Sequence, residues 1–412
     1  MANLAELFGA IRSPRNLVFG PGQRRSLPDF VSSLGRRALV VTDARLSGDA
    51  EFGKLISQLQ EAGISVCVFD GTIAELPLDC IQEGVDAGKE FNADVLVGIG
   101  GGSCIDAAKI ISLLLTHGGK ASDYYGEFKV PGPILPVIAM PTTSGTGSEV
   151  TPVAVLGDAE RVVKVGIASP HLIPHTGICD PELTYSCPPA LTASSGADAL
   201  THAIEAYTTL RRPLQDSLVH DHVFVGKNAL SDHHGLTAIR LISASLKRSF
   251  DNGGDHEARQ QLMLGATTAG LAFGTAGTAA AHAVQYPVGA MTHTPHGVGV
   301  AVMLPYVMAF NRRFCEPEFG QIGEAMGLPV AGSVSERALQ AIDGVANLFA
   351  AVDIPKTIAD LGVQRTQLPL VAEQAMGSAR LIKNNPRPLD NQTMLMLVEA
   401  AFDGDLDRLH NS

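Results

Sequence analysis

The first half of the chain alternates short apolar runs with helical segments, and this alternation constrains the fold more than any other feature. Residues 37–43, 64–70 and 94–98 are apolar runs of strand length. Helical segments at 52–62 and 81–91 separate them. Near-continuous apolar strands joined by helices are typical of parallel sheets that helices cover on both faces. We therefore expect an α/β domain at the start of the chain.

The alternation ends at Pro188 and Pro189. Beyond this point the sequence is a series of long helical patterns, from 190–210 to 390–402, with few strand signals. We predict two domains: a Rossmann-like α/β domain over residues 1–188, and an all-α domain over residues 189–412.

Composition excludes several classes of partner. The 412 residues carry a formal net charge of −12, from 30 basic and 42 acidic residues. Such a balance argues against nucleic acid or an anionic membrane surface as partner. The sequence has no signal-peptide pattern and no apolar run of membrane-spanning length. Its six cysteines are scattered, which favours buried thiols in a reducing compartment, so we expect a cytoplasmic protein.

A glycine turn follows the third apolar run, in Gly98-Ile-Gly-Gly-Gly-Ser-Cys-Ile-Asp-Ala-Ala-Lys109. A strand, a glycine turn and a helix form a phosphate cradle, because the helix N-terminus offers free amides and glycines allow close approach. Ser103 stands where the usual fingerprint has its third glycine. The same pattern could also be a tight turn without a ligand.

Two other polar features belong to the same half of the chain. Asp43 ends the first strand, where it could accept hydrogen bonds from an adenosine ribose, or could equally cap a helix. The segment Met140–Pro152 holds six hydroxyl residues and two glycines between apolar strands at 134–139 and 153–156. This density of hydroxyl groups suits contacts with phosphate or ribose.

Asp198 and His202 are four residues apart, which places both side chains on one face of a helix. The flanking residues are mostly apolar, so we expect a largely buried helix whose ionisable groups need partners or a cation. Taken alone, the pair could be an ion pair on the helix surface. With His282 and His296 added, one carboxylate and three imidazoles make a complete ligand set for a divalent metal.

These motifs together resemble the iron-containing (group III) alcohol dehydrogenases over nearly the whole chain. The matching segments are Gly100–Lys109, Pro141–Thr151, Asp180–Leu183, Gly196–Ala206 and Pro295–Gly297. The resemblance implies that Asp198, His202, His282 and His296 bind one metal, usually Fe²⁺, with Zn²⁺ in some relatives. It also implies that residues 1–188 are the dinucleotide-binding domain and residues 189–412 the metal-binding and catalytic domain, with NAD(P) in a cleft between them. A homo-oligomer, commonly a dimer, is implied as well.

We expect NAD(H) rather than NADP(H), because the Asp43 carboxylate would repel a 2′-phosphate. The expected cofactor contacts are Asp43, Gly100, Gly101, Gly102, Ser103, Asp106, Thr142, Thr143, Ser144, Thr146, Ser148 and Lys164.

The chain departs from the family pattern beside the third ligand. Many members carry a second histidine four residues later, where this chain has Tyr286 before Pro287. A phenol does not titrate easily near neutrality, so the proton relay must differ. His293 is a candidate replacement, although it could also be a solvated loop residue.

The second departure is the stretch 211–232, which is longer than the loop of simple alcohol dehydrogenases. It is similar to the extended segment of hydroxyacid–oxoacid transhydrogenases and of some phosphonoacetaldehyde reductases. Within it, Lys227 lies in a Gly-Lys-Asn turn that could point its charge at an anionic substrate, or it could be solvated surface.

The expected function is a metal-dependent, NAD(H)-linked interconversion of a small alcohol and its aldehyde or ketone, including substrates with a carboxylate or phosphonate tail. A metal at this site acts as a Lewis acid on the substrate oxygen, while hydride passes to or from the nicotinamide. Tyr286, His293 or water carries the proton. The alternative is a transhydrogenase with tightly held NAD.

Overall fold

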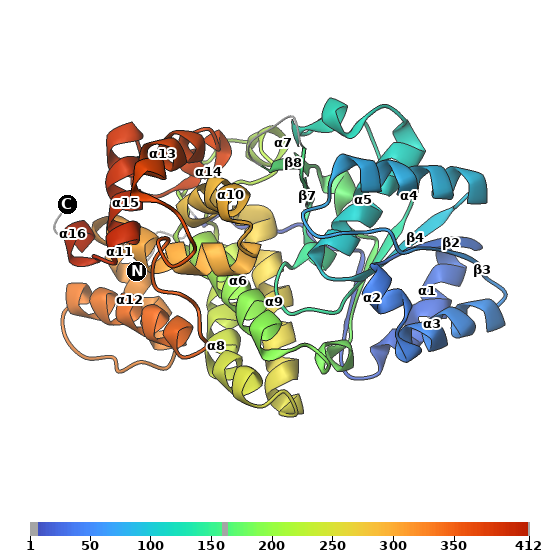
Figure 1. The fold of residues 1–412 in the computed structure, drawn as a ribbon, viewed down its shortest axis with the longest axis horizontal. Helices are drawn as coiled ribbons and strands as arrows, with labels where there is room; N and C mark the ends of the chain where they lie inside the picture. Colours follow the sequence, from blue (N-terminus) through green and yellow to red (C-terminus); the bar gives the residue numbers. More distant parts are fainter. Residues whose placement is uncertain (1–6, 159–163, 411–412) are drawn as a thin grey trace. The chain divides into compact units, whose positions relative to one another are not determined.

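The computed structural model describes residues 7–158 and 164–410, which form two compact units (Figure 1). One unit is Arg12–Ser186, and the other contains Cys187 onward together with the described residues before Arg12. The start of the chain thus differs from the predicted division at residue 188. The Ala229 N–H donates to the Phe8 carbonyl at 2.9 Å, so these first residues pack with the helical unit.

Unit Arg12–Ser186 is built on a six-stranded, entirely parallel sheet in the order β1-β9-β6-β4-β2-β3. The sheet confirms the predicted α/β class. Its strands are β1 Asn16–Phe19, β2 Arg37–Val41, β3 Ser65–Phe69, β4 Val95–Gly100, β6 Val137–Pro141 and β9 Thr176–Cys179.

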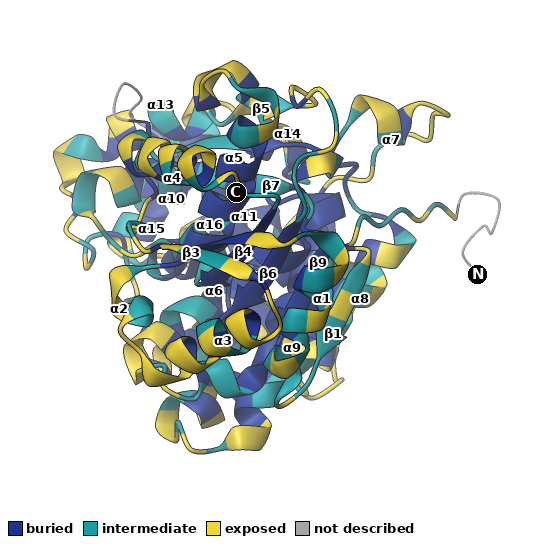
Figure 2. Ribbon diagram, turned by 90° about the vertical axis from the view of Figure 1, so that its right-hand side faces the viewer, coloured by how far each residue is buried: buried dark blue, intermediate teal, exposed yellow. Residues whose placement is uncertain are grey.

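Helices cover both faces of this sheet because its buried strands are apolar on both sides. Along β2, Leu39 and Val41 join one core cluster, whereas Ala38 and Val40 join another, as the two-residue period of a strand requires. Figure 2 shows the centre of the sheet as buried and the outward face of α3 as exposed. The covering helices are α1 Leu27–Leu34, α2 Ala44–Ser47, α3 Ala50–Glu61, α4 Leu78–Phe91 and α5 Gly102–His117.

A second, three-stranded sheet combines β5, which precedes β6, with two strands that follow β6, in the order β5-β8-β7. Its strands are β5 Gly126–Glu127, β7 Val153–Leu156 and β8 Val165–Ala168. The predicted strand at 153–156 is therefore present, but it belongs to this smaller sheet.

The second unit is helical, as predicted, and among its described residues no strand is formed. Its central helix, α6 Pro189–Thr208, packs against α8, α9 and α11 (Figure 1). The remaining helices are α7 Leu218–Asp221, α8 Ala229–Asp251, α9 His256–Ala276, α10 Ala280–Thr292, α11 His296–Ala325, α12 Val334–Ala350, α13 Leu368–Met376, α14 Ala379–Asn384, α15 Asn391–Asp403 and α16 Asp407–His410.

Two helices of this unit continue through an internal proline. Helix α10 continues through Pro287 to Thr292, and α11 continues through Pro305 to a kink at Cys315. Proline lacks an N–H and usually kinks or breaks a helix. Burial of both prolines in the core favours continuation here.

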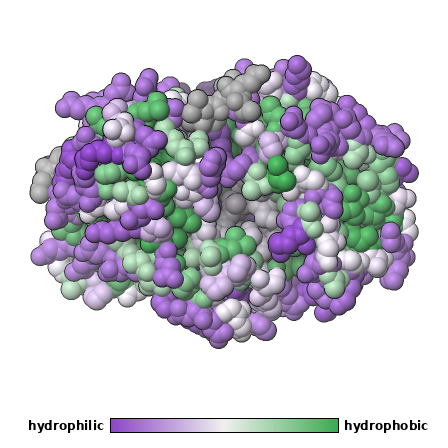
Figure 3. All heavy atoms as spheres, in the orientation of Figure 1, coloured by the Kyte–Doolittle hydropathy of each residue, from purple (hydrophilic) through white to green (hydrophobic). Residues whose placement is uncertain are grey.

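The surface of each unit is mixed in character. Figure 3 shows hydrophilic residues spread over the visible face of each unit, with apolar groups between them. Across the part of the chain that the structure describes, each helix is too short or too polar to cross a bilayer.

Candidate metal centre and cofactor cradle

Helix α6 presents three ionisable side chains on one face, at spacings of four and seven residues. Asp198, His202 and Glu205 are 3%, 6% and 2% exposed, respectively. The helix is buried because small residues allow close packing around it. At Gly196, for example, an added Cβ would lie 2.5 Å from Leu246 Cδ1 of α8. Three polar groups on such a helix require specific partners.

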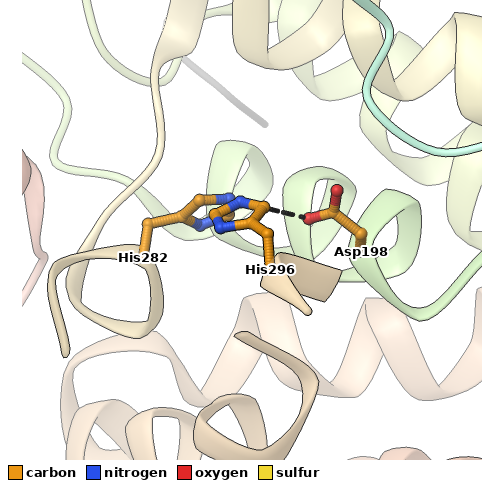
Figure 4. Close-up of side chains that lie close together, drawn as sticks. All are labelled: Asp198, His282 and His296. Atoms are coloured by element: carbon orange, nitrogen blue, oxygen red, sulfur yellow. Dashed lines mark ion pairs between the residues drawn. The ribbon is translucent and has the colours of Figure 1, made fainter. Parts of the chain in front are cut away.

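Three of the four predicted ligands converge. Asp198 Oδ1 lies 3.9 Å from His282 Nε2 and 3.8 Å from His296 Nε2. Figure 4 shows these residues close together, from α6, α10 and α11. Since nitrogen and oxygen ligands lie about 2.0–2.2 Å from a zinc-sized ion, ligands of one ion are roughly 3–4 Å apart. The observed separations are compatible with one shared ion.

His202 borders this group through the carboxylate. Its Nδ1 lies 3.7 Å from Asp198 Oδ1, and its ring centroid lies 4.7 Å from that of His282. The ring stacks on Phe273 at 4.1 Å, which fixes its plane. Only Asp198, His282 and His296 have ligand atoms that all lie within 4.8 Å of one another among the described residues. The role of His202 as a fourth ligand stays a prediction.

Glu205 is a residue that the sequence reasoning missed. Its Oε2 accepts hydrogen bonds from His282 Nδ1 at 2.6 Å and from the Ala279 N–H at 2.9 Å. Its Oε1 accepts from the Ala281 N–H at 2.7 Å. One carboxylate of α6 thus caps the N-terminus of α10 and orients a candidate ligand. The available signal was its position one turn after His202.

Gln285 does the same for the last predicted ligand. Its Oε1 lies 2.7 Å from His296 Nδ1, and glycines make room for the amide. A Cβ at Gly289 would lie 2.5 Å from Gln285 Nε2, and one at Gly299 would lie 2.7 Å from Gln285 Cγ. The signal in the sequence was its position three residues after His282, on the same helix face.

These contacts test whether the residues suit a metal. When a neutral histidine donates its Nδ1–H, its Nε2 carries no proton and has a lone pair that can bind a metal. Hydrogen bonds to Nδ1 commonly fix this tautomer in metal ligands. Within the described chain, His282 Nε2 makes no hydrogen bond. A buried carboxylate beside the Nε2 atoms of two oriented imidazoles suits a divalent cation. The residues therefore fit the metal that the family resemblance implies.

The two proton-relay candidates lie in different environments. Tyr286 is half-buried, and its ring centroid lies 6.2 Å from that of His296. Burial raises the pKa of the Tyr286 phenol, the charge of Arg380 opposes the shift, and the carboxylates of Glu205 and Asp198 add to it. His293 is exposed and ends α10 with a φ of 55°. A role of Tyr286 or His293 in proton transfer stays a prediction.

Lys227 already has partners inside the protein. Its Nζ donates to Asp232 Oδ1 and to the Tyr207 carbonyl, each at 2.8 Å. It lines a cavity of about 430 Å³ that contains Arg211 and Arg212 but none of the predicted metal ligands. Its charge is thus balanced by Asp232, whereas the sequence interpretation requires a charge available to the substrate.

In the other unit, the cofactor candidates meet at a switch point of the parallel sheet. The chain runs from β2 outward to β3, then returns to β4 on the opposite side of β2. Ligands of open α/β sheets bind beyond the carboxyl ends of the strands at such a point. Asp43 follows β2 and the glycines follow β4. These residues thus stand where a dinucleotide binds in such sheets.

The glycine turn has the close approaches that the sequence predicts. A Cβ at Gly102 would lie 2.6 Å from Thr146 Cγ2, and Gly100 has a φ of 150° that other residues rarely adopt. Gly101 faces Thr143, with 3.7 Å from its virtual Cβ to Oγ1. Helix α5 begins here without a side-chain cap. An uncapped N-terminus next to hydroxyl groups fits a phosphate.

Asp43 is engaged on both of its oxygens. Oδ1 accepts from the Arg45 and Leu46 amides at 3.0 and 2.9 Å, which makes Asp43 the N-cap of α2. Cys104 Sγ lies 3.8 Å from Oδ2. The capping role was the alternative that the sequence left open. A carboxylate can accept about four hydrogen bonds, so this cap still leaves capacity for a ribose contact.

The remaining predicted contacts are mostly held by the protein itself. Asp106 accepts from Ser148 Oγ and from the Val155 N–H. Buried Lys109 donates to Ser148 Oγ at 2.9 Å, and its burial lowers the pKa to about 8. These bonds tie α5 to the hydroxyl-rich segment.

Three hydroxyl residues, two of them buried, and one lysine complete the predicted set. Thr142 and Ser144 are buried, and the Thr142 N–H donates to the Gly100 carbonyl at 2.9 Å. Ser103 lies in the first turn of α5 and is half-buried. Lys164 pairs with Glu75 at 2.6 Å. Contacts of these residues with a cofactor stay predictions.

Comparisons with known proteins agree along the whole chain. The profile of the family "Iron-containing alcohol dehydrogenase" matches residues 14–181, and that of "Fe-containing alcohol dehydrogenase family, C-terminal" matches residues 192–402.

Curated relatives and a solved structure match over the same extent. Long-chain-alcohol dehydrogenase 1 of Geobacillus thermodenitrificans is 36% identical, covering 97% of this chain and 100% of the relative. Sulfoacetaldehyde reductase of Bilophila wadsworthia is 33% identical, covering 94% and 98%. A crystal structure of 1,3-propanediol oxidoreductase superposes with a TM-score of 0.89 at 34% identity, covering 96% of this chain and 100% of that one. The chain therefore belongs to the iron-containing alcohol dehydrogenase family and is an oxidoreductase of alcohols and aldehydes.

Proposed function

We propose that the protein binds one divalent ion, Fe²⁺ by preference, through Asp198, His202, His282 and His296, and uses NAD(H) to interconvert a small alcohol and its aldehyde or ketone. The observation that carries this proposal is the convergence of one carboxylate oxygen and two oriented imidazole nitrogens on a common point. A divalent ion there would supply Lewis-acid stabilisation of a developing alkoxide.

The residues of the chain prepare the site in distinct ways. Glu205 and Gln285 accept hydrogen bonds from the Nδ1 atoms of His282 and His296. Each Nε2 is then unprotonated and faces Asp198. The glycine turn and the Thr142–Ser148 segment would bind the pyrophosphate, and Asp43 the adenosine ribose. Tyr286 or His293, or water, would move the proton. NAD(H) is further supported by an NAD-dependent methanol dehydrogenase of Bacillus methanolicus, which is 34% identical to this chain.

We include substrates with an anionic tail, because the sulfoacetaldehyde reductase relative is named for one such aldehyde. By analogy with the family resemblance, we also propose a cytoplasmic homodimer or larger homo-oligomer, which sedimentation velocity would test.

The decisive experiment is an NADH-oxidation screen of the Fe²⁺-loaded protein with neutral, carboxylated, phosphonylated and sulfonated aldehydes. We expect steady NADH consumption with one aldehyde alone, and loss of turnover after chelation of the metal. Turnover that requires a second, hydroxyacid substrate and releases no NAD⁺ would instead indicate transhydrogenation. No turnover with any member of the panel would overturn the proposed function.

A further inference from the structure

We propose that Arg380 is the contact for an anionic substrate tail, so that the enzyme favours short aldehydes with a carboxylate, phosphonate or sulfonate at the end remote from the reacting carbon. This inference rests on the proposed function and names the substrate class of that site. Among the residues that the structure describes, no acidic side chain pairs with Arg380, whereas Lys227 pairs with Asp232.

Arg380 lies at the start of α14, which packs against α10, the helix of His282 and Tyr286 (Figure 1). Its guanidinium sits 4.4 Å above the ring centre of Phe224 and is half-buried. Among the described residues, Arg380 makes no ion pair and no side-chain hydrogen bond. A guanidinium that rests on an aromatic face keeps its in-plane N–H donors available for an oxyanion.

The residues that hold Arg380 in place contact the connection 276–279, which leads into α10. Gly277 has a φ of 83°, and a Cβ there would lie 2.9 Å from Asn384 Nδ2 and 3.2 Å from Phe224 Cβ. Asn384, the last residue of α14, also donates to the Ala276 and Thr278 carbonyls at 3.0 and 3.1 Å. The ring beneath the cation and the helix that carries it therefore both contact this connection, shortly before His282.

Tyr286 links this cation to the metal ligands. It lies one helical turn after His282, and its ring centroid is 6.2 Å from that of His296. The positive charge of Arg380 acts on the Tyr286 phenol against the raising effect of burial on its pKa. Asp198 and Glu205 act on the same phenol from the ligand side. The charge of Arg380 and the carboxylates beside the candidate ligands thus act on the same side chain.

The extended segment acquires a purpose from this arrangement. Phe224 belongs to the stretch 211–232 and is 3% exposed, and the neighbouring Val225 N–H donates to the Thr275 carbonyl at 2.8 Å. The segment is thereby anchored at the end of α9, with its aromatic ring under Arg380. We infer that the added length places Phe224 there, whereas Lys227 anchors the segment through the Tyr207 carbonyl.

The test compares two aldehydes of equal length, one with a terminal carboxylate and one uncharged, in the metal-loaded wild type and three variants. Arg380→Met removes the cation, and Arg380→Lys retains the charge without the planar fork. Arg365→Met is the matched control, because Arg365 also sits on a phenyl ring, that of Phe402 at 4.8 Å, but pairs with Asp403.

We expect Arg380→Met to lower kcat/KM for the carboxylated aldehyde about tenfold to a hundredfold, mainly through KM. The uncharged aldehyde should change less than about threefold. Arg380→Lys should lie between wild type and Arg380→Met, and Arg365→Met should match wild type. Equal loss for both aldehydes, or no loss, would overturn the proposal.

Calorimetric binding of an unreactive carboxylate of the same length separates the two proposals. Binding that weakens in Arg380→Met supports the anion contact even if no aldehyde is reduced, in which case the proposed function alone fails. Turnover with binding that is indifferent to charge overturns the Arg380 assignment alone. If the Arg380 variants do not fold, the wild type decides: the carboxylate must bind at least about tenfold more tightly than its neutral amide.

Discussion

Replacing Glu205 with glutamine should weaken metal binding but leave the protein folded. The carboxylate serves three donors: the Ala279 and Ala281 amides and His282 Nδ1. A glutamine amide offers one oxygen and one NH₂ group, so at least one of the three donors must face another donor. If the NH₂ group faces His282 Nδ1, the imidazole proton moves to Nε2, and that nitrogen can no longer bind a metal.

The magnitude follows from the contacts. One buried donor left without an acceptor costs about 1–3 kcal/mol, and loss of the charge weakens the remaining bonds. We therefore expect metal-free Glu205→Gln to lose roughly 2–4 kcal/mol of its unfolding free energy. Stabilities of 5–15 kcal/mol are usual, so the variant should still fold. Removal of such a partner of a ligand typically weakens metal binding by about 10–100-fold.

The assay measures Co²⁺ or Zn²⁺ affinity by competition with a chromophoric chelator, and the stability of the metal-free protein in urea. Glu257→Gln is the matched control, because Glu257 also lies near the start of a helix but is 72% exposed and pairs with Arg248. It should change neither quantity measurably. If Glu205→Gln loses stability but binds metal as tightly as wild type, Glu205 is only a helix cap and our reasoning about the tautomer is wrong.

Three further predictions concern the ligands, the cofactor and pH. His282→Ala should lower metal content and turnover together, and full activity in a metal-free His282→Ala protein would exclude the assignment. Asp43→Ser keeps an acceptor for the α2 cap but removes the charge, so it should lower the ratio of kcat/KM for NAD(H) to kcat/KM for NADP(H). A wild type that prefers NADPH would contradict this interpretation. Burial lowers the pKa of Lys109 to about 8, below the 10.5 of a free lysine. Between these pH values the unfolded state binds more protons than the folded state, so the unfolding free energy should rise with pH, by on the order of 3 kcal/mol in all. In Lys109→Met this rise of the unfolding free energy, measured in urea, should disappear. An unchanged dependence of stability on pH in Lys109→Met would contradict the role given to Lys109.

The sequence predicted that two of the candidate ligands share a helix face, because their spacing reports local geometry. Asp198 and His202 are four apart on a helix, so their common face follows from the helical repeat. Glu205 lies on the same face, yet its partner His282 is 77 residues away in the sequence, and no local pattern reports that contact. The orientation of the imidazoles therefore emerges only from tertiary packing.

The short edge strand was harder to predict than the central ones. Strand β4 is buried along its whole length and reads as a continuous apolar run. Strand β1 has four residues with mixed exposure, so it has neither a clear period nor sufficient length. The availability of the charges at Lys227 and Arg380 could not be judged either, because it depends on Asp232 and Phe224 as neighbours in space.

The pairing of β1 with β9 sets an order of events during synthesis. Asn16 and Thr176 are bonded partners 160 residues apart, so the ribosome must complete almost the whole first unit before β1 finds its neighbour. At about 5–20 residues per second, β1 waits on the order of 10–30 s. Phe8 waits longer still, for the amide of Ala229. Strand β1 therefore lacks its partner strand while the following 160 residues are synthesised, and this interval gives a chaperone time to bind it.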